Sequence, residues 1–262
     1  MNTKRPLPVR IIDRIITDLL IAAAIVIMAF GGISLWDIYR QYERSSSASI
    51  HMKAGAGDTG FDGLLAIAPD TAAWITLDGT RIDQPVMSAG DNSYYLEHDI
   101  YGRHYIGGCI FIDCRCSPDC SDFYTLIHGH HMDMGAMFGD LEKYSDDTFF
   151  ETHDSGTLYT PERRQDLEIF AYMCADAYDD RIYAPDITAD QDPEGFLKYV
   201  RDHADLYRDI GVGSNDRIAA FSTCSSAFTD GRHVVFARIT DRGLNGEKTV
   251  KKRGTIKTQT ER

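Results

Sequence analysis

Basic side chains are scarce in the main body of this 262-residue chain. The formal net charge is −13, yet both ends are basic: residues 1–44 carry +2 and residues 247–262 carry +4, which leaves −19 for residues 45–246. A body of this charge repels a phosphate backbone, so the composition argues against nucleic acid as a partner. It is compatible with a basic or amine-bearing partner.

Long apolar runs are also missing, with one exception near the start of the chain. Residues 19–36 contain no charged residue and are long enough for a helix that spans a bilayer. The basic residues before this run are Lys4, Arg5, Arg10 and Arg14. The positive-inside tendency then predicts a cytoplasmic segment 1–18, a signal anchor 19–36 and a body outside the membrane. A cleaved signal peptide is the alternative, but the run exceeds a typical h-region and no clear A-x-A site follows.

Paired C-x2-C motifs are absent. The six cysteines stand at positions 109, 114, 116, 120, 174 and 224. The spacing Cys114-x-Cys116-x3-Cys120 differs from that of common zinc sites, which favours free thiols or a local disulfide over a bound metal. Cys109 and Cys174 lie in apolar runs, so we expect them to be small buried side chains.

Internal repeats are absent too, and the chain instead shows many short apolar, β-rich runs between Gly and Asp turns. These runs cover residues 74–77, 82–87, 106–113, 123–128, 157–160, 167–175, 217–222 and 234–239. Helices are expected at 61–68, at 192–210 after the Asp192-Pro193-Glu194 start signal, and in a mixed segment at 137–150. The fold class is therefore mostly β with added helices, as a sandwich or barrel, preceded by one transmembrane helix.

The segments that flank this body are polar. Residues 37–60 are rich in Ser, Ala and Gly toward their end, which predicts a flexible linker before a folded domain over residues 61–245. Residues 246–262 are basic and polar, which predicts a disordered tail.

Cys224 and Arg232 are the first two candidate catalytic residues, a thiol and a guanidinium. Cys224 ends an apolar strand pattern, and Arg232 opens the next one after an Asp230-Gly231 turn. If the two strands pair as a hairpin, both residues lie near the same end of it. An arginine there can lower the pKa of the thiol and hold a substrate carbonyl. The alternative is a structural cysteine beside a surface arginine.

His130 supplies the base that acyl transfer also needs. It follows the strand 123–128 at a glycine turn, where a side chain can point into a groove. His128 shares its strand parity and could bind a metal with it, but no third ligand is evident nearby. We expect structural roles for His128 and His131. A thiol, an imidazole and a guanidinium are a complete set for this chemistry, so no cofactor is expected.

The ordered set of motifs resembles the sortase family, and class B most of all. The resemblance runs from about Phe61 to Ile239. Its motifs are Pro69-Asp70-Thr71-x-x-Trp74-Ile75, Gly79-Thr80-x-Ile82-Asp83-x-Pro85-Val86, Tyr94-Tyr95-Leu96-x-His98-Asp99, Gly108-x-Ile110-Phe111-x-Asp113, Gly129-His130-His131-Met132, Met137-Phe138-Gly139-Asp140-Leu141 and Ser222-Thr223-Cys224 with Arg232. Each is modest alone, but the series in this order is specific.

The resemblance implies an eight-stranded β-barrel and a role for each site residue. Cys224 would be the nucleophile, His130 the acid and base, and Arg232 the cation that clamps the substrate and stabilises the oxyanion. Ser222 and Thr223 would shape the substrate groove, or else only pack within the strand. Two features depart from the pattern: many relatives have tyrosine at the place of His128, and the Cys-rich loop 114–120 has no counterpart in it.

The implied activity is transpeptidation at the cell surface. Such an enzyme cleaves a C-terminal sorting signal of the LPxTG or NPxTN type after its threonine and holds the acyl group on the cysteine. It then passes the surface protein to an amine of a peptidoglycan precursor. The enzyme would be a single-pass protein of a Gram-positive-type membrane, with the catalytic domain facing the wall.

Three alternatives stay open at this point. A pilus-polymerising sortase would differ only in its acceptor, a lysine of a pilin. A membrane-anchored binding domain could use the same barrel without catalysis. A cysteine L,D-transpeptidase would share the acyl-thioenzyme, but its S-H-G-C-x-R pattern is absent here.

Overall fold

Short strands dominate the structure, a computed structural model that describes residues 7–53, 60–132, 135–186, 191–224 and 229–241. The strands are β1 (Thr71–Leu77), β2 (Asp83–Ser88), β3 (Ile110–Ile112), β4 (Tyr124–His128), β5 (Ser155–Tyr159), β6 (Arg164–Asp176), β7 (Leu206–Tyr207), β8 (Arg217–Cys224) and β9 (Gly231–Asp241). The helices are α1 (Leu7–Lys53), α2 (Gly60–Ile67), α3 (Asp147–Thr152), α4 (Asp180–Tyr183) and α5 (Pro193–His203), with 3-10 turns η1 (Tyr94–Leu96) and η3 (Gly139–Ser145).

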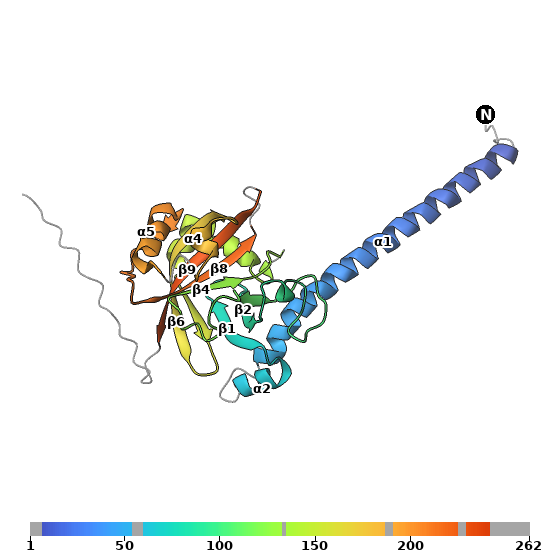
Figure 1. Cartoon of the computed structure of the whole chain (residues 1–262). Helices are drawn as coiled ribbons and strands as arrows, with labels where there is room; N and C mark the ends of the chain where they lie inside the picture. Colours follow the sequence, from blue (N-terminus) through green and yellow to red (C-terminus); the bar gives the residue numbers. More distant parts are fainter. Residues whose placement is uncertain (1–6, 54–59, 133–134, 187–190, 225–228, 242–262) are drawn as a thin grey trace, which may run out of the picture.

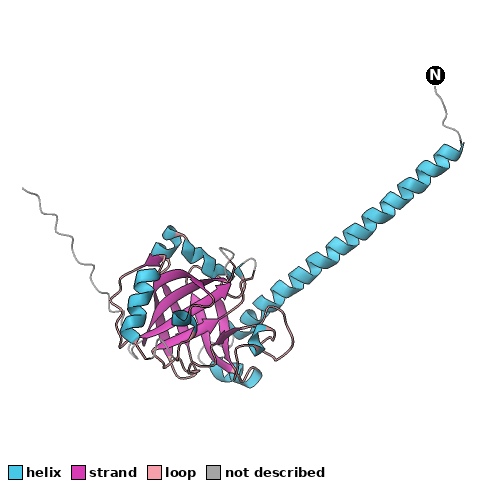
Figure 2. Ribbon diagram, turned by 45° about the horizontal axis from the view of Figure 1, so that its top comes forward, coloured by secondary structure: helices cyan, strands magenta, loops and turns pink. Residues whose placement is uncertain are grey.

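The strands close into a barrel. Their order is β5-β1-β2-β3-β4-β8-β9-β6-β7, and an additional pairing of β5 with β6 joins the two sides of the sheet. Eight strands therefore form the closed barrel, and the two-residue β7 pairs only with β6. Closure removes the exposed edges that an open sheet would present to other chains. Figures 1 and 2 show the barrel with α4 and α5 packed outside it.

Two parallel pairings shape the end of the barrel where the cysteine lies. β2 runs parallel to β3, and β4 runs parallel to β8, with His128 opposite Ser222. Parallel neighbours place their carboxyl ends at the same edge, which hairpins cannot do. The last residues of β4 and β8 therefore meet, although they are 96 positions apart in the sequence.

α5 is anchored to the barrel by its apolar face. The carboxylate of Asp192 caps the helix by accepting a hydrogen bond from the Gly195 N–H, and Pro193 stands in its first turn. Phe196 and Val200 are fully buried, and the Phe196 ring lies 4.5 Å from that of Tyr124 on β4. Burial of a phenylalanine side chain contributes about 2–3 kcal/mol.

The prediction of a long helix over residues 192–210 is wrong beyond His203, where α5 ends. Ala204 takes an extended conformation, and the chain then pairs with β6 as β7. Two contacts hold this turn: the Asp205 carboxylate accepts the Cys174 N–H at 2.7 Å, and Arg208 Nη1 donates to the Ile169 carbonyl at 2.7 Å. Tertiary hydrogen bonds thus override the apolar spacing that predicted a longer helix.

The N-terminal helix is longer than the sequence predicted. α1 continues through Lys53, so residues 37–53 are helical where the sequence predicted a flexible linker. Residues 37–53 contain neither proline nor glycine, which would end a helix, and the first glycine after them is Gly55. The tail 246–262 lies outside the described residues.

Within the part of the chain that the structure describes, one helix passes a length and hydropathy test for a membrane span. Its candidate stretch is Ile11–Asp37, with mean hydropathy 2.4 and none of it buried. Figure 1 shows α1 projecting away from the barrel. An exposed apolar surface of this length in water would be unfavourable, which makes α1 a candidate membrane anchor.

Candidate active site

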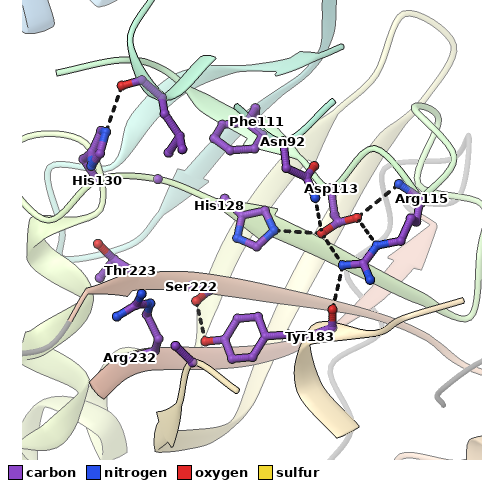
Figure 3. A pocket seen from close by; sticks show the side chains of 13 residues that line it. Asn92, Phe111, Asp113, Arg115, His128, His130, Tyr183, Ser222, Thr223 and Arg232 are labelled. Atoms are coloured by element: carbon purple, nitrogen blue, oxygen red, sulfur yellow. Dashed lines mark hydrogen bonds and ion pairs between the residues drawn. The ribbon is translucent and has the colours of Figure 1, made fainter. Parts of the chain in front are cut away.

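A pocket of about 440 Å³ opens where β4, β8 and β9 meet (Figure 3). Its lining residues are Asn92, Leu96, Phe111, Asp113, Arg115, His128, Gly129, His130, Ala177, Tyr183, Ser222, Thr223 and Arg232. These residues are spread over about 140 positions of the sequence, from Asn92 to Arg232, so only the folded barrel creates the pocket. Four of the five predicted site residues line it: His130, Ser222, Thr223 and Arg232.

Cys224 is the last residue of β8, and its Cα is paired with that of Arg232 on β9. This is the hairpin that the sequence predicted, with both residues at one end. The side chain of Cys224 lies outside the described part of the structure. Asp230 adopts a positive φ of 63° in the turn that starts β9, a conformation that aspartate tolerates better than most residues. Its carbonyl accepts the Ala177 N–H at 2.9 Å, which ties the turn to the end of β6.

Arg232 is half-buried and directs its guanidinium into the pocket. Nη1 donates a hydrogen bond to the Gly231 carbonyl at 2.9 Å. That bond uses a single N–H of a group that carries several, so the guanidinium can also donate to a ligand. A planar cation at this place can stabilise an oxyanion that forms above Cys224.

His130 lies two residues beyond the end of β4. Because His128 is paired with Ser222, His130 is at the position along β4 that corresponds to Cys224 on β8. The Gly129 N–H donates to the Ser222 carbonyl at 3.1 Å, which extends the parallel β4–β8 ladder by one residue toward His130. His130 Nε2 lies 2.9 Å from the Leu96 carbonyl, which can only accept, so Nε2 carries the proton in the neutral ring. Nδ1 is then the nitrogen able to take up a proton, which suits a general base.

Ser222 and Thr223 are both buried, and both line the pocket. The Ser222 hydroxyl lies 2.8 Å from that of Tyr183, in a hydrogen bond that joins β8 to the end of α4. The buried Thr223 hydroxyl has no hydrogen-bond partner among the described residues. An unpaired buried hydroxyl carries a desolvation cost, so it is a polar atom that a bound peptide could satisfy.

A polar network that the sequence did not predict fills the far side of the pocket (Figure 3). Its centre is Asp113, directly after β3 and only 1% exposed. Its carboxylate accepts hydrogen bonds from Arg115 Nε and Nη2 at 2.8 Å each, from Asn92 Nδ2 at 2.9 Å and from His128 Nε2 at 3.0 Å. The available signal was the strand alternation Phe111-Ile112-Asp113, which places a carboxylate beside buried apolar side chains.

The charges of this network are matched. Burial alone would raise the pKa of Asp113, but the hydrogen bonds from Arg115 and His128 outweigh it and hold that pKa well below its usual range. The hydrogen bonds that Arg115 donates to Asp113 raise the pKa of the Arg115 guanidinium. Arg115 also donates from Nη2 to the Tyr183 carbonyl at 2.6 Å. The network therefore joins β3, β4 and the end of α4 around the pocket.

The Cys-rich loop borders this pocket through Arg115, but none of its three cysteines lines it. Cys114 is exposed, Cys116 and Cys120 are buried, and all three are free thiols. Burial raises the pKa of Cys120 to about 12, which disfavours its thiolate. Cys109 is buried as predicted, whereas Cys174 is only half-buried. Among the described residues, no group of three or more His, Cys, Asp or Glu side chains is placed to hold a metal ion.

The chain is similar to known proteins over most of its folded body. No family model matches it. It is 32% identical over 174 residues to Sortase B of Listeria monocytogenes, which is 65% of this chain and 70% of that protein. Sortase B of Clostridium perfringens superposes with a TM-score of 0.64 at 31% identity, covering 70% of this chain and 100% of that one. A Streptococcus pyogenes class B sortase involved in pilus biogenesis superposes with a TM-score of 0.63 at 34% identity, covering 68% of this chain and 97% of that one.

Proposed function

Because this chain belongs to the class B sortases, a family of cysteine transpeptidases, we propose that it joins surface proteins to the cell wall. Its substrate is a C-terminal sorting signal of the LPxTG or NPxTN type, which it cleaves after the threonine. The acceptor is an amine of a peptidoglycan precursor. The reaction proceeds through a thioester on Cys224.

The observation that carries this proposal is the placement of three residue types at one end of the barrel. Cys224 and Arg232 are opposite one another in the β8–β9 hairpin, and His130 follows the strand parallel to β8. Arg232 and His130 both line the pocket. Arg232 and His130 supply a cation and an imidazole at this cavity, and with the thiol of Cys224 they are the groups that acyl transfer requires.

Acylation uses all three groups. His130 first takes the thiol proton of Cys224 on Nδ1. The resulting thiolate attacks the threonine carbonyl, and Arg232 stabilises the oxyanion of the tetrahedral intermediate. As the C–N bond breaks, His130 donates a proton to the departing amine. The carboxyl-terminal part of the signal leaves, and the surface protein remains attached to Cys224 as a thioester.

Deacylation reverses these roles. The incoming amine attacks the thioester carbonyl, and His130 takes a proton from its nitrogen. Arg232 stabilises the second oxyanion, and its collapse forms the new amide and releases the Cys224 thiolate. The acidic body of the chain, at −19 over residues 45–246, favours the approach of an amine-bearing acceptor.

The place of action follows from α1. We place residues 19–36, within the candidate stretch Ile11–Asp37, across the membrane, with the basic N-terminal residues in the cytoplasm and the barrel on the wall side. A wall-facing active site would meet exported proteins and wall precursors at the same surface.

A second acceptor is supported by one observation. The Streptococcus pyogenes relative is a class B sortase involved in pilus biogenesis, and this chain covers 97% of it at 34% identity. A lysine side chain of a pilin would enter the same thioester chemistry as a wall amine. The two acceptors differ in the product that each forms.

The deciding experiment uses the full chain in detergent micelles with fluorescence-quenched LPxTG and NPxTN peptides. Cleavage after threonine that is lost in Cys224→Ala but retained in Cys114→Ala, the matched control for an exposed cysteine, supports the proposal. Adding peptidoglycan stem peptides or a lysine-bearing pilin peptide then shows by mass spectrometry which amine is joined. If Cys224→Ala cleaves as fast as the unmodified chain, the proposed mechanism is wrong; if nothing is cleaved, the barrel is a binding domain.

A further inference from the structure

The backbone of Leu96 contacts the imidazole of His130 from a different part of the chain. Leu96 is the last residue of the 3-10 turn η1, and it lines the pocket together with His130. Its carbonyl oxygen lies 2.9 Å from His130 Nε2 (Figure 3). This hydrogen bond ties the imidazole to a segment 34 positions earlier in the sequence, which carries none of the three proposed catalytic residues.

The carbonyls on either side of Leu96 are held by the segment that leads into β3. The Cys109 N–H donates to the Tyr95 carbonyl at 2.8 Å, and the Tyr105 N–H donates to the Glu97 carbonyl at 2.8 Å. The Leu96 carbonyl between them is directed to the imidazole instead. Backbone hydrogen bonds on both sides therefore fix its direction, and its own side chain is not needed for this.

Side chains hold η1 at its start and at its centre. Asp91 Oδ1 accepts the N–H groups of Ser93 and Tyr94 at 2.7 Å and 2.8 Å. Tyr95 is 2% exposed, and its hydroxyl donates to Asp70 Oδ2 at 2.8 Å. The turn that presents the Leu96 carbonyl is thus supported by hydrogen bonds of its own, as a group that orients a catalytic side chain must be.

Gly108 packs directly against the Leu96 carbonyl. It adopts a φ of 55°, in the left-handed region that glycine enters without steric cost. A Cβ at this position would lie 2.6 Å from the Leu96 oxygen, 2.9 Å from the Leu96 carbonyl carbon and 2.4 Å from the Tyr95 oxygen. All three are backbone atoms, so a side chain here would force η1 to move and would displace the carbonyl that the imidazole contacts.

The same carbonyl decides which ring nitrogen can react. A carbonyl only accepts hydrogen bonds, so Nε2 of the neutral His130 ring carries the proton and Nδ1 carries the lone pair. If the acceptor moved away, the proton could pass to Nδ1 and the ring could rotate. Only part of the molecules would then present a lone pair to the thiol of Cys224.

We propose that the Leu96 carbonyl is the positioning group of His130, and that Gly108 is a positioning residue because the absence of a side chain lets this carbonyl reach the imidazole. The carbonyl is then the third group that orients a base beside its nucleophile. The inference rests on the proposed function, because it takes His130 as the general base. It assigns a role to Gly108, which the sequence indicated only as part of a motif.

The first test locates the proton of His130 without turnover. The full chain with Cys224→Ala is labelled with nitrogen-15 histidine and studied by NMR in detergent micelles at pH 8, where an ordinary imidazole is neutral. Comparison with His130→Asn identifies its signals among those of nine histidines. We expect ring nitrogen shifts that place the proton on Nε2. Adding Gly108→Ala should move these shifts toward the average of the two tautomers.

The second test measures cleavage in chains that retain Cys224. We expect Gly108→Ala to lower kcat/KM about tenfold, because one orienting hydrogen bond is lost. Gly211→Ala is the matched control: Gly211 has a φ of 71° and nothing within 4 Å of an added Cβ, so it adds the same backbone strain without a contact. It should change neither the rate nor the His130 shifts.

Tyr95→Phe covers the case in which Gly108→Ala fails to fold, which melting temperatures would reveal. This substitution removes the hydroxyl that donates to Asp70 and adds no atom to the barrel. Because it loosens η1 without displacing it, we expect a smaller effect in the same direction, about a threefold loss of kcat/KM with a matching change in the His130 shifts.

The outcomes separate the two proposals. A proton on Nδ1, or a mixture of tautomers already present in the Cys224→Ala chain, would overturn the role of the Leu96 carbonyl. A Gly108→Ala chain that matches Gly211→Ala, or that loses rate with unchanged His130 shifts, would overturn the role of Gly108. Shifts that respond to Gly108→Ala as expected, in a protein that cleaves no sorting peptide, would overturn the proposed function and keep the positioning of His130.

Discussion

The Cα of Cys224 is paired with the Cα of Arg232 across the β8–β9 hairpin, at the end of the barrel where His130 follows β4. The two residues are eight positions apart in sequence, and the antiparallel register alone brings them opposite one another. The guanidinium is positioned by a backbone contact of its own turn, Nη1 to the Gly231 carbonyl at 2.9 Å. The site is therefore built mainly on strands, which hold reacting groups more firmly than loops do.

Arg232 should contribute to the transition state rather than to stability. We expect Arg232→Ala to lower kcat/KM by about 100- to 1000-fold, because the oxyanion loses its cation, with little change in melting temperature. Arg232→Lys keeps the charge but loses the planar fork and should recover only part of the rate. Arg201→Ala on exposed α5 is the matched control. Activity of Arg232→Ala within threefold of the unmodified chain would remove Arg232 from the mechanism.

His130 should act in both half-reactions. We expect His130→Asn to lower kcat by about 100-fold or more, because neither the departing nor the incoming amine exchanges its proton efficiently. Rapid-quench measurements should show slower formation of the thioester and also slower transfer to an added amine. His131→Asn is the neighbouring control, since His131 Nε2 instead lies 3.1 Å from Glu142. A defect confined to the first step would contradict the dual role.

Phe196 should be a stability residue only. It is fully buried between α5 and the barrel, so Phe196→Ala leaves a cavity and should cost about 3–5 kcal/mol of unfolding free energy. Chemical denaturation followed by tryptophan fluorescence measures the loss. Lys198→Ala on the exposed side of the same helix should change the unfolding free energy by less than about 0.5 kcal/mol. An equal effect of the two substitutions would mean that α5 does not pack as described.

His233 should make the barrel sensitive to mild acid. Burial, followed by the repulsion of His131, lowers the pKa of His233, and its Nδ1 lies 2.7 Å from the Tyr172 hydroxyl. A group with a lowered folded pKa contributes stability above its unfolded value, about 6.5, and that stability is lost as the pH falls through the folded value. The melting temperature should therefore drop between pH 7.5 and pH 5.

A substitution isolates this contribution. His233→Gln, which has no titrating group, should show a smaller drop in melting temperature over the same pH range, whereas His203→Gln on exposed α5 should match the unmodified chain. A pH dependence that is unaltered in His233→Gln would assign the acid sensitivity to other groups.

The thiols should fall into two reactivity classes. Burial raises the pKa of both Cys109 and Cys120 to about 12, so neither should react with a thiol reagent near neutral pH in the native state. Exposed Cys114 and Cys224, the proposed nucleophile, should react quickly. Titration with a disulfide reagent should lose one fast thiol in Cys114→Ala and one in Cys224→Ala. A fast reaction that survives when Cys114, Cys224 and half-buried Cys174 are all replaced would show that the buried cysteines open to solvent.

Local pattern in the sequence determined much of this protein. Alternating apolar residues predicted most of the strands, because side-chain period follows directly from backbone geometry. The Asp230-Gly231 turn between two such runs predicted the hairpin that pairs Cys224 with Arg232. The uncharged run 19–36 predicted the candidate membrane span, because its hydropathy depends on composition alone.

Contacts between distant segments decided the rest. The Asp113–His128 hydrogen bond exists only because β3 and β4 pair, and the Arg115 contact with the Tyr183 carbonyl only because α4 packs beside them. Residues 204–210 are not helical, although their apolar spacing predicted a helix, because Arg208 and Asp205 form hydrogen bonds with β6. Residue types and spacing indicate which groups can do chemistry, but the register of parallel strands and the partners of buried charges depend on long-range pairing, which local periodicity does not encode.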